Sequence, residues 1–152
     1  MVTDFQVFFR LSASVVLSGL IGFERQFHRR NAGLRTHIMV CLGSCLMMLT
    51  SIYIFDIYKD IVPLDPVRLA AGVITGIGFL GAGTIMRDRT EIKGLTTAAS
   101  LWVVSGIGLS IGCGFYTGAI FATCLALIVL LVLRRAEPLV FEKLQQPHEH
   151  KK

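Results

Sequence analysis

Long hydrophobic runs, separated by short polar clusters, dominate the pattern along this chain. A helix needs roughly 20 apolar residues to cross a hydrocarbon core of about 30 Å. Five runs approach or reach this length: Phe5–Phe23, Thr36–Phe55, Val67–Met86, Leu95–Ile111 and Phe115–Leu133. Three residues separate the last two runs, which predicts a tight antiparallel hairpin. The pattern predicts an all-α, polytopic membrane helix bundle of five transmembrane helices in residues 1–136, followed by a short polar tail in residues 137–152.

The composition agrees with a multi-pass membrane protein. Of the 152 residues, 53% are hydrophobic and 16% are charged, whereas average globular chains carry about 25% charged residues. The formal net charge is +5, but Lys and Arg fall in short clusters between the apolar runs. Such clusters are typical of signals for membrane topology and argue against a nucleic-acid partner. We expect the lipid bilayer to be the surrounding medium.

The loops between the runs alternate in charge and predict an orientation. The first loop holds four Arg against one Glu, the second holds one Lys against three Asp, and the third and the tail are basic. The positive-inside rule then places the N-terminus outside and the C-terminus in the cytoplasm. An odd number of spans requires the two ends to lie on different sides, which this orientation satisfies.

The third run contains a formal match to a phosphate-binding fingerprint, G-x-G-x-x-G, at residues 76–81. A dinucleotide site needs a strand before these glycines and an acidic residue about 20 positions later. Here the glycines lie inside an apolar run, and no acidic residue occurs between Lys93 and Arg135. A nucleotide cofactor is therefore excluded.

Small residues at four-residue spacing suggest another use for glycine. Helices in lipid associate through close backbone approach, which small residues four apart permit. Ser14, Ser18 and Gly22 show this spacing in the first run, and a compact bundle or a homodimer follows. Gly72 and Gly76 have the same spacing, as do Gly108 and Gly112, and Gly78, Gly81 and Gly83 add further glycines to the third run. Because the third run is so rich in glycine, it either packs closely on two faces or is locally broken as a helix.

Ionisable and polar residues at the ends of the runs are the functional candidates. They are Glu24, Arg25, Arg35, Thr36, Asp65, Arg68, Arg87, Asp88, Thr96 and Thr97. The alternative is that they only anchor helix ends at the interface. Glu24 is the most informative, because it is the single carboxylate of a basic loop, and we expect it to converge with Arg35 and Asp88. Arg10 is expected to extend toward the lipid headgroups.

A metal site has weak support. His37, Cys41 and Cys45 are spaced four apart, but the outer two lie about 12 Å from each other along a helix. This distance is too long for one ion to bind all three side chains. A metal site would need two of them together with a ligand from another helix. The sequence carries no hydrolase triad order, zinc-protease motif or Walker motif. We expect no enzyme activity and no cofactor. The sequence does not identify a bound metal, and Mg²⁺ is considered only as a substrate or ligand.

Three segments together resemble the MgtC/SapB family of bacterial inner-membrane proteins. They are GLIGFERQFHRRNAGLRTHIMVCLGS (Gly19–Ser44), DPVRLAAGVITGIGFLGAGTIMR (Asp65–Arg87) and IKGLTTAASLWVVSGIGLSIGCGFY (Ile92–Tyr116). Longer members of that family carry a soluble C-terminal domain, so the resemblance is to a short form. It implies a multi-pass protein of the bacterial inner membrane.

The resemblance implies a link to magnesium homeostasis, and three roles stay open. The chain transports Mg²⁺ or another ion, it modulates another membrane complex without transport, or it serves in acid tolerance. We expect the glycine faces to serve a homo-oligomer such as a dimer, or contact with a membrane-protein partner. Of the polar positions given above, all except Asp88 match the motifs of the family, and no carboxylate falls in the middle of a run.

Overall fold

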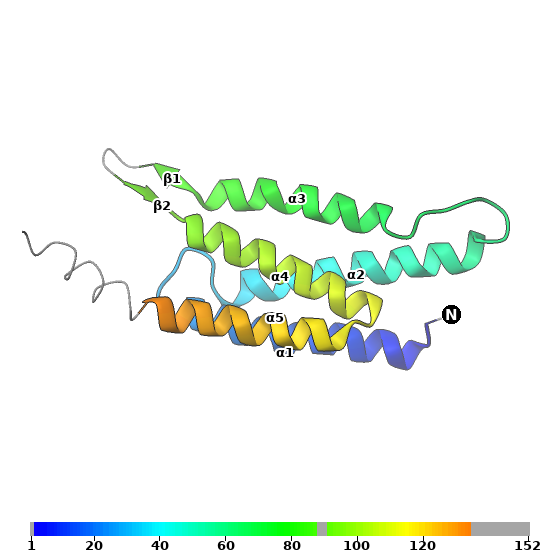
Figure 1. Ribbon diagram of the computed structural model, residues 1–152, viewed down its shortest axis with the longest axis horizontal. Coiled ribbons are helices and arrows are strands. Elements are labelled where there is room, and N and C mark those ends of the chain that lie inside the picture. Colours follow the sequence, from blue (N-terminus) through cyan, green and yellow to red (C-terminus); the bar gives the residue numbers. More distant parts are fainter. Residues whose placement is uncertain (1, 88–90, 135–152) are drawn as a thin grey trace, which may run out of the picture.

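Five helices lying along one common axis make up the protein (Figure 1). The computed structural model describes residues 2–87 and 91–134. The helices are α1 (Asp4–Phe27), α2 (Leu34–Tyr58), α3 (Arg68–Thr84), α4 (Leu95–Cys113) and α5 (Tyr116–Ile128), and α5 continues into the π-helix η1 (Val129–Leu133). Helices that follow each other in sequence run in opposite directions. The prediction of an all-α bundle of five helices is confirmed.

Four of the helices are long and apolar enough to cross a membrane: α1, α2, α4, and α5 together with η1. Helix α3 is shorter, with 17 residues, and measures about 25 Å. It ends at Thr84 and not at Met86 as predicted, because the chain enters a small antiparallel hairpin there. The hairpin pairs β1 (Met86–Arg87) with β2 (Ile92–Lys93), and Met86 lies opposite Lys93.

Local sequence explains where several helices begin and end. Thr3 and Gln6 form a capping box at the start of α1, which satisfies two free backbone N–H groups. Gly114 ends α4 with φ +90°, and Gly94 precedes α4 with φ +95°. A side chain at Gly94 would also overlap the backbone carbonyl of Thr84. Glycine at these two positions lets the chain reverse direction tightly on both sides of α4.

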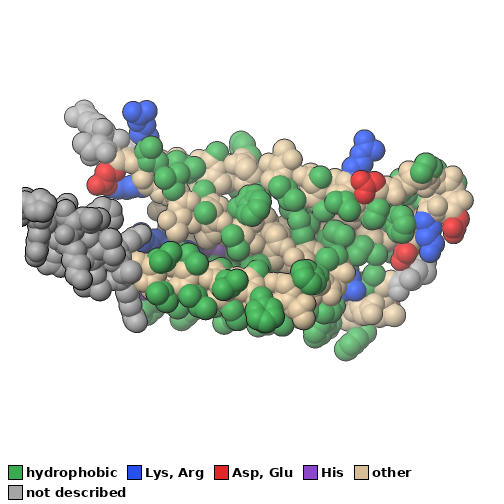
Figure 2. Space-filling view, in the orientation of Figure 1, with side chains coloured by type: hydrophobic (Ala, Val, Ile, Leu, Met, Phe, Trp, Pro, Cys, Tyr) green, Lys and Arg blue, Asp and Glu red, His purple; other side chains and the backbone are tan. Residues whose placement is uncertain are grey.

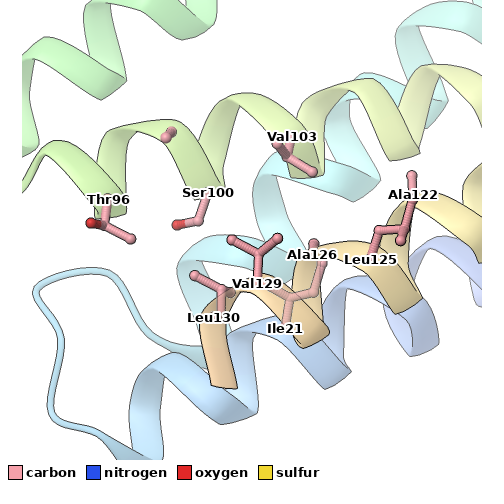
Figure 3. A pocket seen from close by; sticks show the side chains of 10 residues that line it. Ile21, Thr96, Ser100, Val103, Ala122, Leu125, Ala126, Val129 and Leu130 are labelled. Carbon is pink, nitrogen blue, oxygen red and sulfur yellow. The ribbon is translucent and has the colours of Figure 1, made fainter. Parts of the chain in front are cut away.

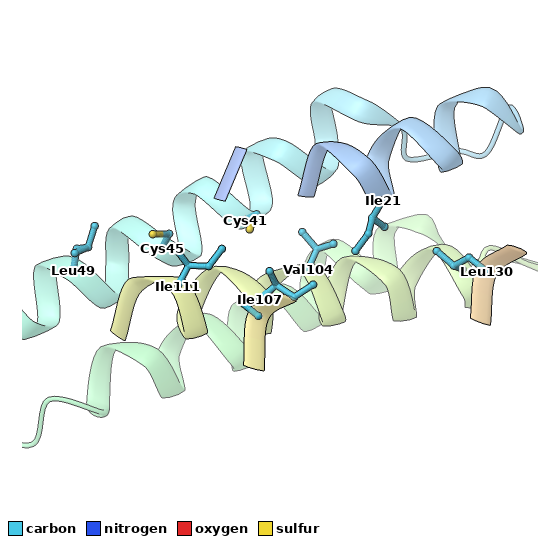
Figure 4. Close-up of a cluster of buried hydrophobic side chains, with 9 residues drawn as sticks. Ile21, Cys41, Cys45, Leu49, Val104, Ile107, Ile111 and Leu130 are labelled. Atoms are coloured by element: carbon cyan, nitrogen blue, oxygen red, sulfur yellow. The ribbon is translucent and has the colours of Figure 1, made fainter. Parts of the chain in front are cut away.

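Helix α4 lies at the centre of the bundle and packs against each of the other four helices. The largest buried cluster takes Ile21 from α1, Cys41, Cys45 and Leu49 from α2, and Val104, Ile107 and Ile111 from α4 (Figure 4). Helix α3 lies at the edge, against α4 and α2. This arrangement leaves a large part of the α3 surface without a neighbour in the single chain.

Hydrophobic side chains are exposed along most of the length of the face shown in Figure 2. Phe79 on α3 is 84% exposed, Phe5 on α1 75% and Phe121 on α5 70%. Inside, the hydroxyls of Ser18, Ser44 and Thr123 donate to carbonyl groups one turn back in their own helices. Within the described residues, no buried side-chain nitrogen or oxygen lacks a hydrogen-bond partner, as a hydrocarbon surrounding requires.

Charged side chains gather toward the two ends of the bundle. We call the end formed by residues 24–35, the hairpin, the start of α4 and the end of η1 the basic end (Figure 1). Its described Lys and Arg residues are Arg25, Arg29, Arg30, Arg35, Arg87, Lys93 and Arg134, against Glu24 and Glu91. The opposite end carries Asp4, Asp56, Asp60 and Asp65 together with Arg10, Lys59 and Arg68. The excess of positive charge among the described residues therefore lies at the basic end.

Candidate functional site

Glu24 is the centre of a buried polar cluster at the basic end. It lies in the last turn of α1, and its residue is 6% exposed, while its neighbour Arg25 is 2% exposed. Both Nε and Nη2 of Arg25 donate to the Glu24 carboxylate, the latter at 2.9 Å. His28, one turn later, places its Nδ1 2.9 Å from Glu24 Oε1. The carboxylate is thereby neutralised and held by its own helix, as charges at membrane depth require.

The α1–α2 contact beside this cluster is unusually close. A Cβ atom on Gly22 would lie 2.8 Å from the Cα of Leu34 on α2, so no larger residue fits there. Ser14 and Ser18, which share the face of Gly22, are fully buried. Small residues at this spacing therefore do bring α1 against α2.

His37 joins α2 to α4 in the same region. Its Nδ1 lies 2.8 Å from the carbonyl oxygen of Gly33, and its Nε2 lies 3.1 Å from Oγ of Ser100. The Oγ of Ser100 also lies 2.8 Å from the carbonyl oxygen of Thr97. Because both ring nitrogens already have partners, the fully buried His37 acts here as a bridge between helices.

The fold does not support a metal site at His37, Cys41 and Cys45. The two cysteines belong to the buried apolar cluster. No group of three His, Cys, Asp or Glu side chains able to hold a metal ion occurs among residues 2–87 and 91–134.

The structure separates the remaining polar candidates into two groups. Arg35, Thr36, Arg87 and Thr96 are exposed at the basic end, whereas Thr97 is 4% exposed. Asp65 and Arg68 lie at the opposite end, where the Asp65 carboxylate accepts from the backbone N–H of Val67 at 2.8 Å. Asp88 lies outside the described residues. Convergence of Glu24, Arg35 and Asp88 therefore stays a prediction.

Two glycines of α4 lie directly against α2. A side chain on Gly108 would overlap the Cys41 carbonyl oxygen and would place its Cβ 2.8 Å from the Ser44 Cβ. A Cβ on Gly112 would lie 2.8 Å from the Cys45 carbonyl oxygen. These positions form the α2–α4 seam at the centre of the bundle.

The glycines of α3 behave differently. The helix is α-helical over its whole length, so the local break considered above is absent. Cβ atoms placed on Gly72, Gly76, Gly78 and Gly83 would meet nothing within 4 Å. Gly81 alone of the predicted α3 set faces a neighbouring helix, with its Cβ position 3.6 Å from the Cβ of Ala98. Close packing on a second face of α3 therefore does not occur within one chain.

Arg10 corrects another expectation. It donates from Nη1 to the Gly112 carbonyl at 2.8 Å and from Nε to the Tyr116 hydroxyl at 3.1 Å. Its guanidinium thus binds the C-terminal end of α4, where carbonyl groups lack helical partners, and does not extend toward the headgroups. The isolated Arg in an apolar run signals a buried partner, but the sequence does not say which one.

A cavity at the basic end includes residues that the sequence analysis did not select. It has a volume of about 430 Å³ and is lined by Arg25, Arg30 and Arg134, by the start of α4, and by apolar residues of η1. The pair Arg134-Arg135 could be recognised from sequence as a topology signal, but its meeting with Arg30 depends on the packing of α5 against α1 and α4.

These features define the class of the protein. Four helices long enough to span a membrane, an apolar exterior and satisfied buried polar groups are features of a helical membrane protein. The comparisons name the family. The model of the MgtC family matches residues 11–139, and this chain belongs to that family.

Curated relatives agree with the family. The chain is 46% identical over 128 residues to "Putative magnesium transporter YhiD" of Escherichia coli K12, covering 83% of this chain and 60% of the relative. It is 42% identical over 132 residues to "Protein MgtC" of Salmonella typhimurium, covering 87% of this chain and 54% of the relative. The chain thus spans between half and two thirds of the length of these relatives. No solved structure matches it.

Proposed function

We propose that this chain acts in magnesium homeostasis as a multi-pass protein of the bacterial inner membrane, by packing α3 against another membrane helix. The magnesium link rests on the family and on the printed name of the Escherichia coli relative. The positive-inside rule would place the basic end in the cytoplasm. The observation that carries the mode of action is the uncovered glycine face of α3.

The uncovered glycines line up along one side of α3. At 100° per residue, Gly72, Gly76 and Gly83 lie within about 40° of one another, and Gly81, which faces α4, lies on the other side. Each of the three exposes backbone with nothing within 4 Å of a Cβ position. Phe79, about 20° from Gly72 around the helix, is 84% exposed and projects beside these glycines. Lipid gives helices little hydrophobic reason to associate, so small residues beside an exposed aromatic side chain favour contact with another helix. A second copy of this chain or a different membrane protein would supply that helix.

The single bundle offers poor surroundings for Mg²⁺ itself. Mg²⁺ takes oxygen ligands, commonly carboxylates and retained waters. Within the described residues the buried carboxylate is Glu24, which Arg25 and His28 already engage. The cavities described are lined mainly by apolar residues, apart from the one at the basic end, where arginines would repel a cation.

The proposal is tested by growth in low magnesium. In a bacterium whose own family member has been deleted, expression of Gly76→Leu should leave growth at the level of the empty vector, because the leucine blocks close approach to α3. Gly106→Leu is the matched control, since a Cβ on this α4 glycine also meets nothing within 4 Å. Growth supported equally by both variants, at equal membrane abundance, would refute a role for the α3 face.

Direct transport of Mg²⁺ is the second candidate. It is favoured by the name of the Escherichia coli relative and by the position of Glu24 at the basic end. It would require the Glu24 carboxylate to leave its partners or a pathway formed between copies of the chain.

A further inference from the structure

We infer that the basic end holds a binding site for an anionic phospholipid, with its phosphate in the arginine-lined cavity and one acyl chain in the groove between α4 and α5. The inference goes beyond the magnesium-related role and does not depend on it.

The charge of the cavity fits a phosphate. Arg30 and Arg134 both line it, and neither forms an ion pair with another described residue. Arg25 also lines it, but two of its nitrogens serve Glu24. The other described acidic residue at this end, Glu91, lies 3.6 Å from Lys93. Among the described residues, this end of the chain therefore gives the cavity an excess of two positive charges. Arg recognises phosphate oxygens well because its guanidinium presents several donors in a fixed geometry.

The start of α4 adds donors to the same wall. Gly94, Leu95, Thr96 and Thr97 all line the cavity. Helix α4 has no side-chain cap and no acidic residue in its first turn. Its first backbone N–H groups and its dipole therefore favour an anion at this position.

A second cavity identifies the anion as part of a lipid. It has a volume of about 320 Å³ and runs between α4 and α5, and it shares Thr96, Val129 and Leu130 with the basic cavity. Figure 3 shows the small side chains of Ala122 and Ala126 on α5 facing Val103 and Ser100 on α4 across this groove. From Thr96 to Val103 the groove extends about 10 Å along α4. A free phosphate would make no favourable contact with this apolar groove, whereas an acyl chain would fill it.

The position of the site also suits a phospholipid. The basic end carries most of the described Lys and Arg residues, so the anionic leaflet surface would lie at the depth of the cavity. The π-helical segment η1 contributes Val129, Leu130 and Leu133 to the wall, and such segments are frequent at functional sites. Headgroup and chain would thus lie in one continuous, membrane-facing depression.

The test measures phosphatidylglycerol bound to the purified full-length chain in detergent by native mass spectrometry, with phosphatidylcholine as the reference lipid. We expect preferential retention of phosphatidylglycerol, reduced about fivefold by Arg30→Gln or Arg134→Gln. Lys93→Gln removes one charge from the same end without touching the cavity lining, and should leave retention unchanged. Ala126→Leu should also reduce retention by filling the groove.

A second groove supplies the control for Ala126→Leu. An apolar groove between α1 and α5, lined by Ala13, Val16 and Ile120, contains no arginine in its lining, so Ala13→Leu should leave retention of phosphatidylglycerol unchanged. Circular dichroism and size-exclusion profiles establish that each variant is folded.

Each other result overturns the inference. Equal retention in the arginine variants and in Lys93→Gln would mean that lipid coats the bundle without a site. Sensitivity to Arg30 and Arg134 without sensitivity to Ala126→Leu, together with displacement by millimolar inorganic phosphate, would assign the cavity to a free phosphate. Preferential retention of phosphatidylcholine would show that the positive charge of the cavity does not select an anionic lipid.

Discussion

Replacing Gly108 with leucine is expected to lower the free energy of unfolding by about 3 kcal/mol or more, at the upper end of the cost of overpacking a core. The reason is geometric. A Cβ at this position already overlaps the carbonyl oxygen of Cys41 and lies 2.8 Å from the Ser44 Cβ. The first of these is a backbone atom of α2, which cannot rotate away as a side chain would. Denaturation of the purified protein in mixed micelles measures the loss.

The same substitution two residues earlier is the control. Gly106 lies on α4 as well, but a Cβ there meets nothing within 4 Å. Gly106→Leu should leave the stability unchanged or raise it by up to about 1 kcal/mol, because leucine is the better helix former. Equal destabilisation by the two variants would contradict the α2–α4 contact described above. The result would also show why Gly108, unlike Gly76, is unsuited to probe a partner outside the bundle.

Replacing Glu24 with leucine is the second large expected loss, of about 3–5 kcal/mol. The side chains of Glu24 and Arg25 are 5% and 3% exposed, so removing the carboxylate leaves a guanidinium charge buried without its counterion. Unfolding in micelles at neutral pH, followed by circular dichroism, measures the effect.

A double-mutant cycle separates the lost pair from the lost packing. Glu24→Leu combined with Arg25→Leu should recover most of the stability, because no buried charge is left unpaired. The exposed pair of Glu91 and Lys93, 3.6 Å apart, provides the contrast, since Glu91→Leu should cost less than about 1 kcal/mol. Additive losses at Glu24 and Arg25 would mean that the two side chains do not depend on each other.

Much of the fold could be predicted because the membrane imposes simple rules on sequence. Apolar runs of nearly fixed length predict the number of helices, and short connections make consecutive helices antiparallel. Proline and acidic residues mark the long connection between α2 and α3. The boundary at Thr84 was missed because Ile85 and Met86 are as apolar as the helix before them, and strand pairing with Ile92 and Lys93 ends the helix there.

The site could be predicted in part. Glu24 stands out in sequence as an acidic residue in a basic loop, and it is the centre of the buried cluster. Hydrophobic patterning does not show which glycines face a helix and which face outward, because every side of a membrane helix is apolar. Gly108 and Gly76 look alike in sequence, yet one is covered by α2 and the other is open. The partners of Arg10 and the meeting of Arg30 with Arg134 depend on segments about 100 residues apart.

We propose that the chain serves magnesium homeostasis through contact with another helix and does not carry Mg²⁺ by itself. Uptake of Mg²⁺ into proteoliposomes that contain the purified chain, next to Glu24→Gln, tests it most directly. An ionophore added at the end of each trace shows that the vesicles are sealed and that the Mg²⁺ indicator responds. We predict that neither protein exceeds empty liposomes with a Mg²⁺ gradient in either direction. Uptake by the unmodified chain that Glu24→Gln abolishes would contradict the claim and make the basic end the mouth of a transport pathway.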